Sequence, residues 1–358
     1  SLDISAGGRQ GWLVGVANPD LAAKAFGAQM KALANPVAAQ KLQNSILNRP
    51  NAANYKRGGL YLSPLGSHSE EAFQGKLFQN WKRLNPIEAS ERAYSAYLNS
   101  IRADAFDRMV KSAGVSDTET LKAIANYVNV ATGRGGGPQM AKAAELLNNV
   151  MFSPRFVASR FQYVGFSPLW GGTKASRAAI AKQYARTLLG LGTAIGLLEA
   201  LPGTEVEKDP RSSDFLKVRI GNTRTDFLGG IQQGIVLAAR LAEKKTKTPA
   251  EPGKVGQVKQ AQPSNVLARF ARSKASPVAG VAWTWIEEKS FTGEEMKRND
   301  PATYAKFGRD LIVPLTGKEL YEAAVKDGAQ PQDAQMLLNI LGFSTANFDK
   351  EESHKPRP

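Results

Sequence analysis

The chain of 358 residues predicts a mainly α-helical fold, an irregular multi-helix bundle with one β-hairpin at about residues 214–228. Over most of its length, apolar residues recur at spacings of three and four, which is typical of the buried face of an amphipathic helix. Helix-start signals such as Asn18-Pro19 precede these stretches. Only Asp214–Leu228 alternates apolar and polar residues around a turn, Gly221-Asn222.

Helices of the first half are predicted in order after Asn18, over Pro36–Asn48, from Ser69, over Pro86–Ala113 and after Ser116, which would cap the last of them. The longest places Tyr97, Ile101 and Phe106 on one face, and Gly114 ends it. We expect these aromatic stripes to form the helical core.

A second long helix is predicted over Thr173–Leu201, and its later half, Thr187–Leu198, carries no charge in twelve residues. Twelve residues are too few to span a bilayer, which needs about 20. Gly192 and Gly196 would allow another helix to pack closely. The pattern favours a buried pair of helices, with transient membrane insertion as the alternative.

The remaining elements are a helix after Gly230, a helix capped by Ser264 and further helices near 277–289, after Asp300, at 318–325 and at 331–341. Four regions follow: a helical region at 1–115, a central core at 116–245, a flexible linker at 246–263 and a helical region at 264–358. The linker is predicted because Lys245–Pro263 has three Pro and no apolar periodicity.

The composition offers few side chains that could carry out enzyme catalysis. The chain has no Cys and only two His, His68 and His354, which leaves almost no room for thiol catalysis, a His-based metal site or a Ser-His-Asp triad. Adjacent acids such as Glu70-Glu71 point about 100° apart on a helix and do not converge. The sequence therefore predicts no catalytic residue, no metal and no cofactor.

The Gly-rich segment Gly133–Pro138 invites comparison with phosphate-binding loops, but it follows a helix and lacks both the P-loop and the dinucleotide-binding patterns. A helix-to-helix connection that needs positive φ is the favoured interpretation.

Positive charge is the strongest functional signal, and two windows carry +14 of the net +15. Arg134 to Arg186 holds eight Lys/Arg against one acid, and Arg240 to Lys274 holds nine against two. Such surfaces favour an anionic partner, and Arg can contact phosphate without reading bases. The candidate DNA-binding residues are Arg134, Arg155, Arg160, Lys174, Arg177, Lys182, Lys244, Lys245, Arg269 and Arg272.

The predicted hairpin is a second candidate site, because two strands alone are marginal and exposed strand edges pair with other strands. Its apolar residues Leu216, Val218, Ile220 and Phe227 are expected to be covered, by helices of this chain or by a neighbouring segment of a parent protein.

Five segments resemble the C-terminal region of the very large multi-domain proteins of tailed bacteriophages, often called large polyvalent proteins. They are Arg49–Ser63 (RPNAANYKRGGLYLS), Glu88–Met109 (EASERAYSAYLNSIRADAFDRM), Asn129–Gln162 (NVATGRGGGPQMAKAAELLNNVMFSPRFVASRFQ), Asp209–Gln233 (DPRSSDFLKVRIGNTRTDFLGGIQQ) and Phe291–Met296 (FTGEEM). The chain departs from this family after Gln233, where a Lys-rich segment stands in place of a Ser/Thr-rich one.

The resemblance implies a non-enzymatic module of a virion protein that is packaged with the genome and ejected with it. Its expected partners are phage double-stranded DNA, contacted non-specifically, and other virion, ejection or portal proteins. Its expected location is the capsid interior and, after infection, the host envelope or cytoplasm. The absence of an initiating Met is expected for a piece of a longer polypeptide.

Two alternatives stay open. The chain could be the C-terminal part of a giant virion-associated RNA polymerase whose active site lies elsewhere. It could also be a cell-envelope ejection component with transient membrane contact through Thr187–Leu198.

Overall fold

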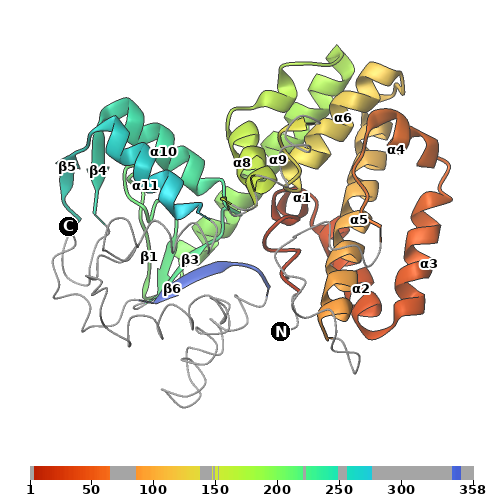
Figure 1. Cartoon of the computed structure of the whole chain (residues 1–358), viewed down its shortest axis with the longest axis horizontal. Coiled ribbons are helices and arrows are strands. Elements are labelled where there is room, and N and C mark those ends of the chain that lie inside the picture. Colours follow the sequence, from red (N-terminus) through yellow and green to blue (C-terminus); the bar gives the residue numbers. More distant parts are fainter. Residues whose placement is uncertain are drawn as a thin grey trace.

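The computed structural model describes residues 4–64, 86–137, 147, 150–151, 153–220, 223–248, 256–275 and 341–347. Within them the protein is mainly helical, with one four-stranded sheet and one two-stranded ladder. Figure 1 shows a helical part built from the first helices and a smaller part that holds the strands. The predicted fold class, mainly α with a hairpin, is confirmed.

The helical part surrounds α5 (Pro86–Ala113), which packs against α2 (Pro19–Ala34), α3 (Pro36–Leu47) and α6 (Thr118–Ala131). The short helices α1 (Trp12–Ala17) and α4 (Ala52–Gly58) complete it. The predicted aromatic stripe of α5 is buried, including Tyr97, Ile101 and Phe106. Its burial confirms the expected core.

Prolines begin α2 and α3 at the predicted positions, but the caps differ from expectation. The Asn18 side chain does not cap α2; it donates to Val14 O (3.0 Å) and to Gln183 Oε1 (2.9 Å). α6 begins one position later than Ser116 predicts, because the Asp117 carboxylate accepts a hydrogen bond from Thr120 N at 2.9 Å. A carboxylate is the stronger acceptor at a positive helix end.

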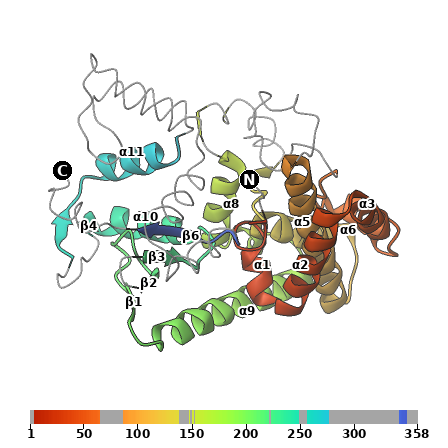
Figure 2. The same cartoon turned by 90° about the horizontal axis from the view of Figure 1, so that it is seen from below.

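The helical and strand parts are joined by α8 (Pro154–Val164), the short 3-10 helix η2 (Ser167–Leu169) and the 26-residue α9 (Lys174–Glu199). Tyr127, Tyr163 and Tyr184 fix this junction, with ring centroids 4.6–6.2 Å apart. The Thr187 hydroxyl donates to Leu13 O at 3.2 Å, which ties α9 to α1. Figure 2 shows α9 running along an edge of the molecule to the sheet.

The sheet has the antiparallel order β1 (Thr204–Val206), β2 (Val218–Ile220), β3 (Thr223–Asp226), β6 (Ser344–Asn347). The predicted hairpin is therefore its central pair, and both of its edges are occupied by strands of the same chain. The strands are shorter than residues 214–228; Leu216 has φ 53° and lies before β2.

The predicted linker at 246–263 is wrong at both ends. β4 (Lys245–Lys247) pairs antiparallel with β5 (Val258–Gln260), between α10 (Gln232–Glu243) and α11 (Pro263–Ser273). Lys247 of β4 is also held by acids far away in the sequence, as described below.

Several predictions fall outside the described residues: the helix from Ser69, the Gly221-Asn222 turn, the helices near 277–289, after Asp300, at 318–325 and at 331–341, and both His residues.

Candidate nucleic-acid interface

The Gly-rich loop follows α6 and is held against α8. Gly133, Gly136 and Gly137 have φ of 84°, 82° and 61°, as the helix-to-helix interpretation expects. Gly135 N donates to Arg155 O (3.2 Å), and Gly136 N donates to Gln162 Oε1 (2.8 Å). A Cβ at position 135 would lie 2.3 Å from Ser159 N, so the backbones meet as closely as glycine allows. These two amides serve packing and are not directed at an anion.

Arg134 and Arg155 surround the ring of Tyr61. The guanidinium carbons lie 4.1 Å and 5.9 Å from the ring centroid, and that of the buried Arg102 lies 5.2 Å away. Arg134 also donates to the Tyr61 hydroxyl at 3.1 Å, and Arg155 Nε donates to Gly135 O at 3.4 Å. Both are half-buried. These contacts join the Gly-rich loop and α8 to Tyr61, which precedes α5 in the chain.

Arg160 is a correction to the predicted surface. Its side chain is 3% exposed, donates to Ala131 O (3.3 Å) and Arg9 O (2.9 Å), and stacks on Phe156 at 4.3 Å. Burial lowers the pKa of Arg160 to about 10. The phosphate contact predicted for Arg160 is therefore wrong, since this guanidinium is engaged by carbonyl oxygens of the core.

The first half of α9 is the clearest basic surface. Lys174, Arg177, Lys182 and Arg186 are all exposed. Glu199, the last residue of α9, is the helix's single acid, and it pairs with Lys208 at 2.6 Å. Four cations therefore stand on this half of the helix with no acid interleaved. We call Lys174, Arg177, Lys182 and Arg186 the basic half of α9.

A hollow of about 180 Å³ lies between α5 and α9, beside this basic half. Arg108, Ser112, Lys182 and Arg186 contribute to its lining. Arg108 pairs with Asp20 across Nη1 and Oδ1 at 3.0 Å, and that hydrogen bond holds the pKa of Asp20 at about 2. The hollow therefore has three cations in its lining, one of which is already paired with Asp20.

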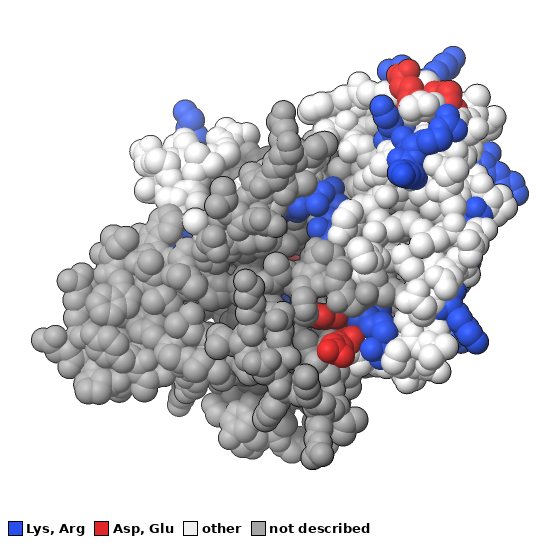
Figure 3. All heavy atoms as spheres, turned by 45° about the vertical axis from the view of Figure 1, so that its right-hand side comes forward, with Lys and Arg blue, Asp and Glu red and all other residues white. Residues whose placement is uncertain are grey.

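The second basic window is partly neutralised. Lys247 Nζ contacts both Glu207 carboxylate oxygens at 2.9 and 2.8 Å, and Arg240 donates to Arg211 O at 2.7 Å. Among the four predicted contacts here, Lys244 and Arg269 are exposed, whereas Lys245 and Arg272 are half-buried. Figure 3 shows Lys and Arg in separate groups over the helical part, not in one continuous field.

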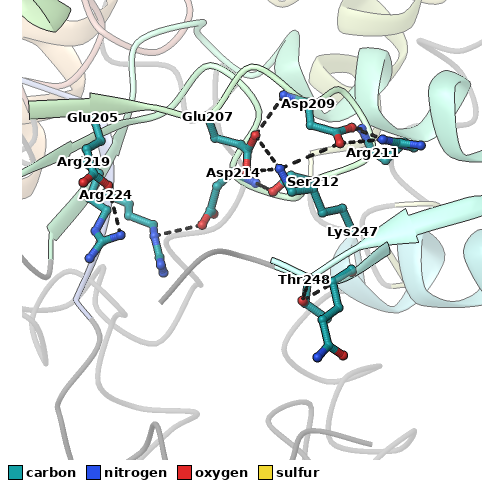
Figure 4. A network of polar contacts seen from close by, with 11 residues as sticks. Glu205, Glu207, Asp209, Arg211, Ser212, Asp214, Arg219, Arg224, Lys247 and Thr248 are labelled. Carbon is teal, nitrogen blue, oxygen red and sulfur yellow. Dashed lines mark hydrogen bonds and ion pairs between the residues drawn. The ribbon is translucent and has the colours of Figure 1, made fainter. Parts of the chain in front are cut away.

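A polar network explains this neutralisation (Figure 4). Asp209 pairs with Arg211 (2.7 Å), and the buried Asp214 pairs with Arg224 of β3 (2.8 Å). Arg211 also reaches Glu243 (3.2 Å). Together with Lys247, these pairs fasten the loop between β1 and β2 to β3, to α10 and to β4. Sequence periodicity could not reveal this network, because its partners lie up to 40 residues apart.

Replacing Asp209 with Asn tests the network. The hydrogen bond from Arg211 lowers the pKa of Asp209 from 3.8 to about 2, so its contribution to stability is present above pH ~4 and is lost as pH falls toward 2. At pH 7 we expect a fall in melting temperature of about 1–3 °C, because the pair is partly solvated. The difference from the parent should close between pH 4 and pH 2. Glu119→Gln on the exposed side of α6 is the control, and an equal shift there would remove the network explanation.

The four hairpin residues do not share a covered face. Val218 is 1% exposed, but Ile220 is 53% exposed. Leu216 packs against the core from outside the strand, and Phe227 lies 5.0 Å from the ring of Phe343 beside β6. The expected cover of Ile220 is therefore wrong. Covering of Val218 by this chain is confirmed, and β1 and β6 occupy the two edges of the β2–β3 pair that another chain could have joined.

The uncharged half of α9 is a further correction. The sequence favours a buried pair of helices over Thr187–Leu198, yet Leu188, Leu189 and Leu197 are exposed. Thr187, Leu191 and Ile195 are the residues that face the core. Across the part of the chain that the structure describes, no helix is long and apolar enough to cross a membrane.

Neither the search for metal ligands nor the comparison with known proteins assigns a function to a residue of this chain. Within the described ranges, no three His, Cys, Asp or Glu side chains gather as metal ligands would. Comparison of the chain with protein-family models, curated protein sequences and solved structures finds no match.

Proposed function

We propose that this chain is a non-enzymatic, polyanion-contacting structural module. The observation that carries the proposal is the basic half of α9, where four exposed cations project from a rigid helix without an interleaved acid. Helix-borne cations meet phosphates of a nucleic-acid backbone without reading base sequence.

The particular setting that we propose is a large phage virion protein, packaged with double-stranded DNA in the capsid and ejected with it. The five resembling segments support this setting, and the exposed Lys244 and Arg269 add a second contact region. Other virion, ejection or portal proteins would be its protein partners.

A giant virion RNA polymerase remains the alternative parent. This chain would then be its non-catalytic C-terminal part and would keep the same DNA-contacting surface. The intact mass of the virion protein that contains this segment separates the two settings.

Duplex DNA binding tests the proposal. We expect the chain to bind duplexes of unrelated sequence alike, with an affinity that falls steeply as salt rises. Replacing Lys174, Arg177, Lys182 and Arg186 together by Gln should reduce the slope of log affinity against log salt by about one unit for each phosphate that is no longer neutralised. Fluorescence anisotropy over a salt series measures both quantities.

The matched control replaces four exposed lysines elsewhere on the helical part, Lys31, Lys41, Lys56 and Lys122, by Gln. It changes the net charge equally but spares the basic half of α9. An equal fall in affinity for both variants would mean that net charge, not this surface, determines binding. No binding by the parent at low salt would end the proposal.

A further inference from the structure

DNA contact leaves the second half of α9 unexplained. Leu188, Leu189 and Leu197 are 60%, 71% and 67% exposed, and Leu201 just beyond the helix is 52% exposed. A Cβ built at Gly192 or at Gly196 would meet nothing within 4 Å. Large exposed leucines at one end of a helix are apolar surface of the kind that marks an interaction site. We call these four residues the leucine half of α9.

Lys182 and Arg186 of the basic half share one face of α9 with Leu189 and Leu197 of the leucine half, whereas Arg177 and Leu188 lie on other sides of the helix. Lys182, Arg186, Leu189, Thr193 and Leu197 are all exposed and follow one another at intervals of four, three, four and four. Residues at these intervals form a single stripe along a helix. The stripe is basic at its start and apolar at its end, on a helix of 26 residues that is about 39 Å long. Its position along the edge of the molecule leaves it accessible (Figure 2).

Charge decides between the possible occupants of this face. A second copy packed parallel along the whole stripe would set cations against cations, and an antiparallel copy would set cations against leucines. DNA satisfies the basic half but offers nothing apolar to the leucines. An anionic lipid surface matches both halves, since it presents phosphates above hydrocarbon.

We infer that the outer face of α9 docks on an anionic phospholipid surface. Leu189 and Leu197 enter the boundary between headgroups and acyl chains, while Lys182 and Arg186 lie among the phosphates. The hollow that Lys182 and Arg186 help to line lies beside this stripe. The helix lies on the membrane and does not cross it. This inference goes beyond the proposed DNA contact, because it depends on leucines that DNA does not use.

Vesicle flotation tests the inference. The parent chain should float with vesicles of phosphatidylcholine mixed with phosphatidylglycerol, less so in high salt, and far less with phosphatidylcholine alone. Leu189→Gln combined with Leu197→Gln should weaken binding to the mixed vesicles by about tenfold or more. Lys182→Gln and Arg186→Gln should each weaken it about fivefold. Circular dichroism confirms that each variant remains helical.

The matched control is Leu47→Gln with Leu267→Gln, two leucines of α3 and α11 that are 51% and 49% exposed. It removes the same chemistry away from α9 and should bind as the parent does. Unchanged vesicle binding by the Leu189/Leu197 variant would overturn the inference. So would a dimer of the parent that this variant abolishes, because a second copy would then occupy the face.

DNA binding by the same variants separates the two proposals. The Leu189/Leu197 variant should bind duplex DNA as the parent does, whereas the Gln variant of the basic half should bind both ligands more weakly. A parent that binds mixed vesicles but no DNA would overturn the proposed function and leave the membrane inference standing. A parent that binds DNA but no vesicles would do the reverse.

Discussion

Replacing Phe106 with Ala should lower the free energy of unfolding by about 3–5 kcal/mol, the largest loss expected from any single substitution considered for this chain. Phe106 is fully buried on α5 and meets Tyr55 edge-on at a centroid distance of 5.5 Å. The helices around it cannot collapse into the space, because α5 is held by neighbours on several sides. Urea denaturation followed by circular dichroism measures the loss.

The control is Phe26→Ala on α2, where the side chain is 41% exposed. It removes the same ring from a site with little cavity to form and should cost about 1 kcal/mol or less. Similar losses for the two variants would mean that α5 is not the centre of the core.

Replacing Val218 with Asp should also be strongly destabilising, by about 3 kcal/mol or more. Val218 is the buried residue of β2, and its backbone pairs with Val206 of β1 and Thr225 of β3. A carboxylate there would have to lose its hydration or force the sheet apart. The melting temperature at neutral pH measures the effect.

Ile220→Asp is the matched control on the same strand. Ile220 is exposed, so a carboxylate there should stay hydrated and change stability little. If Ile220→Asp were as harmful as Val218→Asp, the two positions of β2 would not differ as the structure shows.

Local sequence signals predict the longer helices α2, α3, α5, α6 and α9, because their causes are local, but they miss α1, α4 and α8. The prolines at Pro19 and Pro36 begin helices where expected, and the stripe of α5 faces the core. The strands are harder to predict from the sequence. The β2–β3 pair has its own alternation, but β1 and β6 are short segments that become strands only because the hairpin offers them its edges.

Charge patterning predicted α9 better than it predicted α8. On α9, every predicted cation is exposed. On α8, Arg155 and Arg160 look alike in sequence, yet Arg160 is buried because the carbonyls of Ala131 and Arg9 need a donor. Both arginines donate to a carbonyl, but only Arg160 is fully buried, and this depends on segments brought together only by folding.

The prediction that the uncharged half of α9 is buried is wrong for a related reason. An uncharged run of twelve residues predicts burial all round, but one helix touches its neighbours on one side only. Thr187, Leu191 and Ile195 fill that side, and the remaining leucines face outward.

The pairing of β3 with β6 also shapes how the protein is made. β6 leaves the ribosome roughly 120 residues of chain after β3, which takes about 6–24 s at ordinary translation rates. Trp12 is synthesised even earlier than β3, and its ring packs edge-on against Phe343 at a centroid distance of 4.7 Å. During that interval β3 carries a bare edge that any other strand can join. Lower growth temperatures or a chaperone that binds extended segments should therefore raise the yield of soluble chain.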